Sequence, residues 1–144
     1  MTKYLVPLIM LTLSEIVWAQ PIGDIDELQI RIEKCIKGAA PDGCLNKLLA
    51  PHLPPGHEEL SKTIPKITSG LANWLAGDTV YAVHPIKKTK AGNLYERRVY
   101  VIEDEKGNFM VFDSSYIRIR GNLYMKALNL SNKREVIDAL FKDQ

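Results

Sequence analysis

The pattern of apolar residues changes once along the chain, near Thr79, and this change limits the folds that the sequence can adopt. Before Thr79, apolar residues recur every three or four positions, as on one face of an α-helix. After it, runs rich in β-branched and aromatic residues are separated by short turn signals, as in antiparallel hairpins. Helices followed by a meander predict an α+β domain, with N-terminal helices packed on a curved antiparallel sheet.

Three amphipathic helices are predicted before this change. Asp24 and Glu27 form the pattern of a capping box at the start of the first helix, and a short second helix with Leu45, Leu48 and Leu49 inward follows in the segment DGCLNKLLAPHLPPG. The third helix contains Pro65, which is tolerated best in a first turn. We therefore predict that Thr63 is the N-cap of the third helix.

The second part of the chain contains the predicted strands. Gly-Asn pairs and similar turn signals lie between them, so neighbouring strands should pair as hairpins. Asp113, Ser114 and Ser115 interrupt the apolar pattern, either as a tight turn or as a bulge inside one long strand. A short C-terminal helix is predicted to start at Asn132, with Glu135 placed to complete a capping box.

The first residues are predicted to form a secretory signal peptide. Lys3 precedes an apolar run, and Val17 and Ala19 place small residues where a signal peptidase cleaves. The run is too short for a stable membrane span, which needs about 20 residues. We expect residues 1–19 to be removed and residues 20–144 to form one exported domain, periplasmic or secreted. The alternative is a buried N-terminal helix in an uncleaved protein.

The two cysteines, Cys35 and Cys44, lie in the segment CIKGAAPDGC. An even pair in an exported chain predicts a disulfide that joins the end of one helix to the start of the next. Two free buried thiols are the alternative. The spacing lacks the Cys-x-x-Cys pattern that is typical of redox-active pairs.

Motifs for catalysis, metals and cofactors are not apparent. His52, His57 and His84 are not spaced as zinc ligands, and neither a nucleophile elbow nor a phosphate loop occurs. We therefore predict no metal and no cofactor. Asp113 and His84 are the only weak candidates for acid–base chemistry. The formal net charge of +2 gives no reason to expect nucleic acid or an anionic membrane as a partner.

Two groups of residues are candidates for recognition. A ligand pocket is expected between the third helix and the sheet, near Trp74, Tyr95 and Tyr100.

A partner-binding face is the second candidate, in the segment YIRIR. Tyr116, Arg118 and Arg120 should lie on one side of the strand, and both residue types are favoured at interface centres. The alternative is that arginines merely cover the wet side of a half-buried strand. Asn129 begins an Asn-x-Ser triplet, which would be glycosylated only in a host that glycosylates exported proteins.

The order of these elements, from LQIRIEKCIKGAAPDGCLNKLLAP through IPKITSGLANWLAG to YIRIRGNLYMKALNL, resembles small exported members of the nuclear transport factor two-like superfamily. The resemblance implies a cone in which a curved sheet wraps around a long helix and leaves a pocket. Leu123 and Tyr124 stand where many relatives have a tryptophan, and the helix after Ser131 is additional. No catalytic residue of the superfamily can be placed here, and the fold alone does not give function.

These observations predict an exported, non-catalytic binding or accessory protein that recognises a small ligand or an envelope protein. The sequence is also compatible with a homodimer. One alternative is a periplasmic inhibitor or immunity protein that caps a toxic enzyme. Another is an isomerase-like or hydrolase-like enzyme of the same fold, which would need a titratable group in the pocket.

Overall fold

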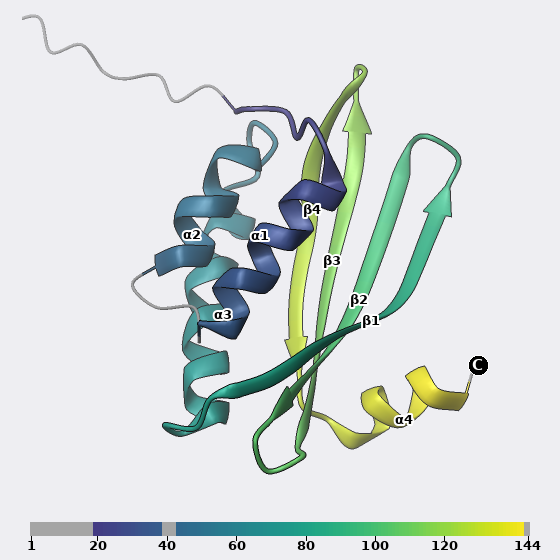
Figure 1. The fold of residues 1–144 in the computed structure, drawn as a ribbon. Coiled ribbons are helices and arrows are strands. Elements are labelled where there is room, and N and C mark those ends of the chain that lie inside the picture. The colour runs from purple at the N-terminus through teal and green to yellow at the C-terminus, as the bar shows by residue number, and fades with distance from the viewer. Residues whose placement is uncertain (1–18, 39–42, 143–144) are drawn as a thin grey trace, which may run out of the picture.

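The computed structural model describes residues 19–38 and 43–142, which form an α+β domain as predicted. Residues 1–18, which carry most of the predicted signal peptide, lie outside the described residues. The four strands form one antiparallel sheet in the order β1-β2-β3-β4. The elements are α1 (Ile25–Lys37), α2 (Cys44–Leu49), the 3₁₀ turn η2 (Ala50–His52), α3 (Glu58–Leu75), β1 (Val80–Ala91), β2 (Tyr95–Asp104), β3 (Phe109–Ile119), β4 (Asn122–Ser131) and α4 (Arg134–Lys142) (Figure 1).

Helix α1 begins where the sequence predicts. The carboxylate of Asp24 accepts hydrogen bonds from the backbone N–H groups of Asp26 and Glu27, at 2.7 and 3.2 Å. It therefore satisfies two of the donors that a helix start leaves unpaired. The predicted N-cap is confirmed, and α1 buries the face that carries Leu28, Gln29, Ile32, Cys35 and Ile36.

Helix α3 begins earlier than predicted. It starts at Glu58, so Pro65 lies inside the helix and the prediction of Thr63 as N-cap is wrong. Two acidic residues occupy its first turn, where the partial positive charge of the helix favours them. Pro65 is exposed, so its ring lies on the solvent side of the helix.

Strand β3 is continuous through the serine pair. Of the two alternatives for residues 113–115, the long strand is correct. The break in strand pairing lies in the neighbouring strand β4, because Ser115 pairs with Ala127 while Tyr116 pairs with Met125. Lys126 of β4 is therefore the extra residue of a β-bulge.

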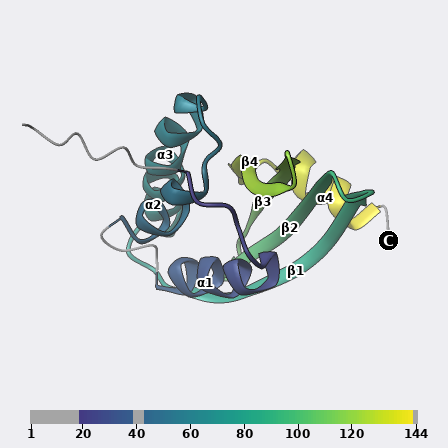
Figure 2. The same cartoon turned by 90° about the horizontal axis from the view of Figure 1, so that it is seen from above.

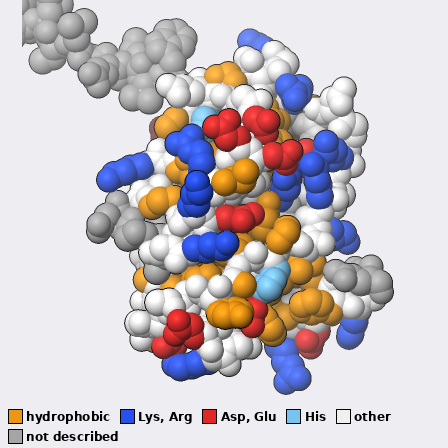
Figure 3. Space-filling model, in the orientation of Figure 1, with side chains coloured by type: hydrophobic (Ala, Val, Ile, Leu, Met, Phe, Trp, Pro, Cys, Tyr) orange, Lys and Arg blue, Asp and Glu red, His pale blue; other side chains and the backbone are white. Residues whose placement is uncertain are grey.

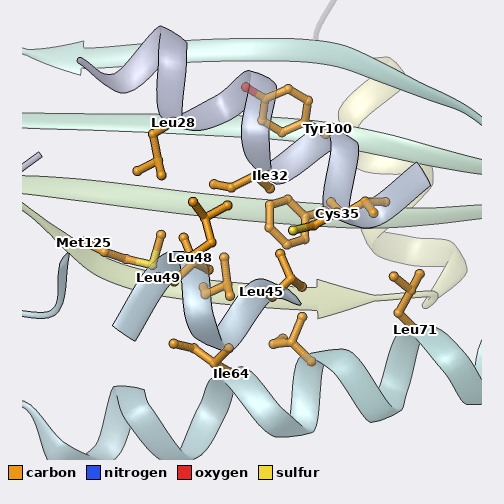
Figure 4. Close-up of a cluster of buried hydrophobic side chains, with 14 of the residues drawn as sticks. Leu28, Ile32, Cys35, Leu45, Leu48, Leu49, Ile64, Leu71, Tyr100 and Met125 are labelled. Carbon is orange, nitrogen blue, oxygen red and sulfur yellow. The ribbon is translucent and has the colours of Figure 1, made fainter. Parts of the chain in front are cut away.

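Alternation along the strands separates two faces of the sheet. Helices α1, α2 and α3 cover one face, and α4 lies on the other (Figure 2). The main core fills the space between the three helices and the sheet (Figure 4), and its members include Leu28, Ile32, Leu45, Leu49, Ile64, Leu71, Phe112, Tyr116, Met125 and Leu128. The other face holds a small cluster in which Val99, Val101 and Val111 pack against Ile86, Val136, Ile137 and Leu140.

The predicted disulfide is present and joins α1 to α2. The Cα atoms of Cys35 and Cys44 are 5.8 Å apart, within the usual range for a disulfide. Residues 39–42, between the two helices, lie outside the described part of the chain.

Both edges of the sheet carry features that disfavour pairing with further strands. On β1, the lysines 87, 88 and 90 are exposed next to Pro85 and a register shift. On β4, the N–H of Ile22 donates to the carbonyl of Leu123 at 2.7 Å, so the N-terminal segment covers the first part of that edge. Charges, proline and a covering segment all disfavour pairing with a strand of another molecule.

Candidate ligand-binding groove

A groove surrounds Trp74 where the last turn of α3 meets the ends of β4 and the β2–β3 turn. It consists of two depressions of about 370 and 410 Å³ that share Trp74 and Asn132. We call this site the Trp74 groove. Gly70, Asn73, Met110, Leu130 and Ser131 also line the smaller depression. Residues 107–109 of the turn and Arg134, Ile137 and Asp138 of α4 also line the larger one.

The position of Trp74 follows from the packing of α3. Ile67, Leu71 and Leu75 are buried in the core, whereas Trp74 is only half-buried at the edge of this apolar stripe. One turn earlier, a Cβ atom at Gly70 would lie 3.4 Å from the side chain of Leu130. Helix α3 therefore approaches β4 closely at Gly70, and this approach brings the indole of Trp74 to the end of the sheet.

The β2–β3 turn is firmly held on the opposite side. The carboxylate of Asp104 accepts from the backbone N–H groups of Lys106 and Asn108, at 2.9 and 2.8 Å, and from the side-chain amide of Asn108 at 2.7 Å. The hydrogen bond from the Asn108 side chain contributes most to lowering the pKa of Asp104. Phe109, the next residue, is 39% exposed and lines the larger depression.

Two polar contacts join this turn to the connection between α3 and β1. Lys106 Nζ lies 2.5 Å from Asp78, and the hydroxyl of Thr79 donates to Glu105 at 2.6 Å. The tip of the sheet is thereby tied to the end of α3. Trp74 and Phe109 both line the larger depression beside these contacts.

The polar lining of the groove is mostly uncharged. Asn73, Ser131 and Asn132 contribute amide and hydroxyl groups, and the hydroxyl oxygen of Ser131 also accepts from the N–H of Lys133 at 3.3 Å. The charged side chains of the lining are Arg134 and Asp138, which are 3.7 Å apart and of opposite sign. The groove can thus offer an aromatic surface and hydrogen bonds, but it does not bring together an acid–base pair.

The three predicted ligand-binding residues do not share one pocket. Trp74 lines the groove described above, but Tyr100 is 4% exposed in the core under α1. Tyr95 lies beside a separate depression of about 80 Å³ near the β1–β2 turn, together with Arg118.

The three predicted partner-binding residues are also separated. Tyr116 is fully buried, and its hydroxyl lies between the side chains of Gln29 and Ser114. Arg118 is exposed, and it donates to the carbonyl of Gly121 at 2.7 Å and to that of Asn93 at 3.2 Å, so it bridges two hairpin turns. Arg120 is exposed in a turn, with a φ angle of 50°.

The candidates for acid–base chemistry lie outside the groove. His84 Nε2 is 2.8 Å from a carboxylate oxygen of Glu103. Asp113 accepts from the guanidinium of Arg97, and this hydrogen bond raises the pKa of Arg97. Both pairs are cross-strand contacts on the sheet.

A charged network that the sequence did not predict joins α1 to the sheet. Arg98 Nη2 lies 2.5 Å from a carboxylate oxygen of both Asp26 and Glu96, and Lys88 and Lys90 lie 3.6 and 3.4 Å from Glu96. The side chains of Arg98 and Glu96 are only 12% and 11% exposed. On the face shown in Figure 3, acidic and basic side chains are accordingly intermixed rather than gathered by sign.

A larger single depression lies elsewhere on the surface. A depression of about 460 Å³ lies beside the disulfide, next to Arg31, Lys34, Lys47 and Leu48. Its rim includes Gly38, the last described residue before the gap at 39–42, so the described residues give only part of its surroundings.

The groove residues other than Trp74 gave no signal in the sequence. Asn73, Ser131 and Asn132 are ordinary polar residues near helix and strand ends, and only the fold brings them together. Within the ranges that the structure describes, no three His, Cys, Asp or Glu side chains are grouped to hold a metal ion. No helix of these same ranges has the length and apolar character needed to cross a membrane.

Comparison with known proteins adds no relative. No family model matches the chain, and neither the curated proteins nor the solved structures yield a match.

Proposed function

We propose that this chain is an exported, non-catalytic binding protein that holds a small ligand in the Trp74 groove. The observation that carries the proposal is the half-buried indole of Trp74, which borders two adjacent depressions whose hydrogen-bonding groups are mostly uncharged. Binding sites for small molecules combine apolar and aromatic surface with a few placed polar groups, and the groove has this composition.

The disulfide supports the exported location. Cys35 and Cys44 are bonded, and such bonds persist in oxidising compartments but are rare in a reducing cytosol. The backbone of Gln20, the predicted mature N-terminus, is already tied to the fold. Its N–H donates to the carbonyl of Pro51 at 2.7 Å, and its carbonyl lies 2.9 Å from Nδ1 of His52.

The non-catalytic part of the proposal rests on the lining of the groove. Its charged groups, Arg134 and Asp138, lie at its rim, with side chains that are 93% and 54% exposed. General acid–base catalysis needs a titratable group placed against the reacting atoms, in an environment that adjusts its pKa. The relation to the nuclear transport factor two-like superfamily remains part of the proposal and rests on the helix-then-meander order.

Tryptophan fluorescence tests the proposal. The sequence has two tryptophans, so in the full chain with Trp18→Phe all tryptophan emission comes from Trp74. The dialysable fraction of an extract from the envelope of the native host should protect Trp74 from quenching by acrylamide. A control chain carries Trp18→Phe, Trp74→Phe and Tyr81→Trp, because Tyr81 is 71% exposed and does not line the groove. Equal quenching with and without the extract in both chains would contradict the proposal.

A further inference from the structure

We infer that the ligand of the Trp74 groove is a neutral carbohydrate whose ring lies against the indole of Trp74. The inference rests on the proposed function, because it names the chemical class of the ligand for the same groove. Its basis is the combination of charge, aromatic surface and hydrogen-bonding groups that the groove presents.

The charge of the groove disfavours an ionic ligand. Arg134 and Asp138 cancel each other at a separation of 3.7 Å, so neither cations nor anions meet a net opposite charge. An ionic group that leaves water without such a partner loses solvation that is not replaced. A neutral ligand avoids this cost.

The aromatic surface favours a ligand with a flat apolar face. Trp74 borders both depressions, and Phe109 lines the larger one. A pyranose ring exposes C–H groups on its faces and hydroxyl groups around its edge. It can therefore cover the indole with its apolar face while its hydroxyls remain available to the side walls.

The polar groups at the walls match hydroxyls in particular. Asn73 and Asn132 each offer an amide that both donates and accepts, and Ser131 adds a hydroxyl with the same double capacity. Sugar hydroxyls also donate and accept, so each can bond to either end of an amide. Asn73 comes from the end of α3, Ser131 from the end of β4 and Asn132 from the link to α4, and all three line the smaller depression.

The size of the groove fits two sugar units better than one. The two depressions share Trp74 and Asn132, and their volumes of about 370 and 410 Å³ lie at the lower end of the usual range for ligand sites. The groove is open to water, so each atom of the ligand should contribute little binding free energy. We expect a dissociation constant on the order of 0.1–1 mM for a disaccharide.

The test uses the full chain with Trp18→Phe and four kinds of probe. Cellobiose, maltose and diacetylchitobiose are the neutral sugars, glucuronate is an anionic sugar, cyclohexanol is an apolar ring, and pentaproline is a peptide that aromatic grooves can bind. At least one neutral disaccharide at 10 mM should reduce acrylamide quenching of Trp74 about twofold or more, and glucuronate should not.

Matched asparagine variants locate the effect. Asn132→Leu should weaken binding of the sugar about tenfold, because it removes the amide shared by both depressions. Asn46→Leu, at an exposed position of α2 outside the groove, should leave it unchanged. Circular dichroism checks that both variants fold. Equal weakening by the two variants, or none by Asn132→Leu, would overturn the inference.

The remaining outcomes separate the inference from the proposed function. Suppose that cyclohexanol or pentaproline protects Trp74 from quenching and no neutral sugar does. The groove would then still be a binding site, but the inference that its ligand is a carbohydrate would be wrong. Protection by glucuronate alone would also overturn it. If the envelope extract protects Trp74 while every named probe fails, the proposed function stands and the inference falls.

Discussion

The two faces of the sheet differ in how firmly they are covered. Three helices and a disulfide close one face over a core that includes fully buried Leu45, Leu49 and Ile64. On the other face, α4 contributes no buried residue and packs only Val136, Ile137 and Leu140 against three valines. Since apolar area removed from water sets most of the stability, the first face should carry the fold and the second should be weakly held.

The Trp74 groove lies where these two faces meet. One wall belongs to α3 on the firmly covered face, and another belongs to α4 on the weakly covered face. A ligand in the groove would contact both walls. Binding should therefore stabilise α4 more than any other helix.

The largest expected effect is a cavity on the helix-covered face. Leu128 is 1% exposed in β4, and Leu128→Ala removes side-chain atoms that the core surrounds. We expect a loss of about 3–5 kcal/mol in the free energy of unfolding, measured by urea denaturation. A loss below about 1 kcal/mol would contradict the assignment of the main core to this face.

The disulfide should come next. Replacing both Cys35 and Cys44 by serine should lower the free energy of unfolding by about 2–3 kcal/mol, because the short loop is no longer closed in the unfolded chain. Reduction of the unmodified protein should give a similar loss. If neither treatment changes the denaturation midpoint, the bond does not hold α1 against α2.

The charged network on the same face should have a smaller effect. Burial raises the pKa of Glu96, but the hydrogen bond and the charge of Arg98 outweigh it, so the pKa lies below its usual value. The hydrogen bond and the charge of Arg98 likewise lower the pKa of Asp26. Arg98→Met should lower the free energy of unfolding by about 2 kcal/mol at pH 7. This loss is smaller than for a fully buried ion pair, because Asp26 and Lys88 are exposed.

The pH dependence of stability tests the same network. Since both carboxyl groups have a lower pKa in the folded state than in the unfolded chain, their stabilisation is present above the unfolded values, near pH 4. It is lost as the pH falls through the lower folded values. The unmodified protein should thus lose more stability than Arg98→Met between pH 7 and pH 3. Parallel pH curves would show that Arg98 does not set these pKa values.

The smallest effect is expected on the other face. Leu140→Ala in α4 makes the same chemical change as Leu128→Ala, but Leu140 is only half-buried. The free energy of unfolding should fall by about 1 kcal/mol or less. Equal losses for the two leucine variants would remove the contrast between the faces.

The sequence predicted the elements better than the site. Apolar spacing, the Asp24 cap and the turn signals depend on neighbours in the chain, and they predicted the helices and the hairpins. The even pair of cysteines predicted the disulfide. Pro65 led to a wrong prediction of where α3 starts, because an exposed proline is tolerated inside a helix that the core holds in place. Tertiary packing can override a local preference in this way.

The site depends on contacts between distant segments. Tyr116 has the sequence context of an exposed strand residue, yet the sheet turns it toward Gln29 of α1, 87 positions away in the chain. Asn73 and Asn132 come together only after α3 packs against β4 at Gly70. The periodicity of a sequence does not indicate which distant segments will contact each other. Trp74 was therefore the only residue of the groove that the sequence analysis named as a ligand-binding candidate.

Hydrogen exchange of the backbone amides can show whether a ligand binds between the two faces of the sheet. The full-length protein is compared with and without the neutral disaccharide that protects Trp74 best. With the sugar bound, exchange should slow in α4, in the last turn of α3 and in the β2–β3 turn, while exchange in α1 and α2 should be unchanged. Slowing confined to α1 and α2, or no slowing in α4 at a saturating concentration, would contradict a ligand site between the two faces.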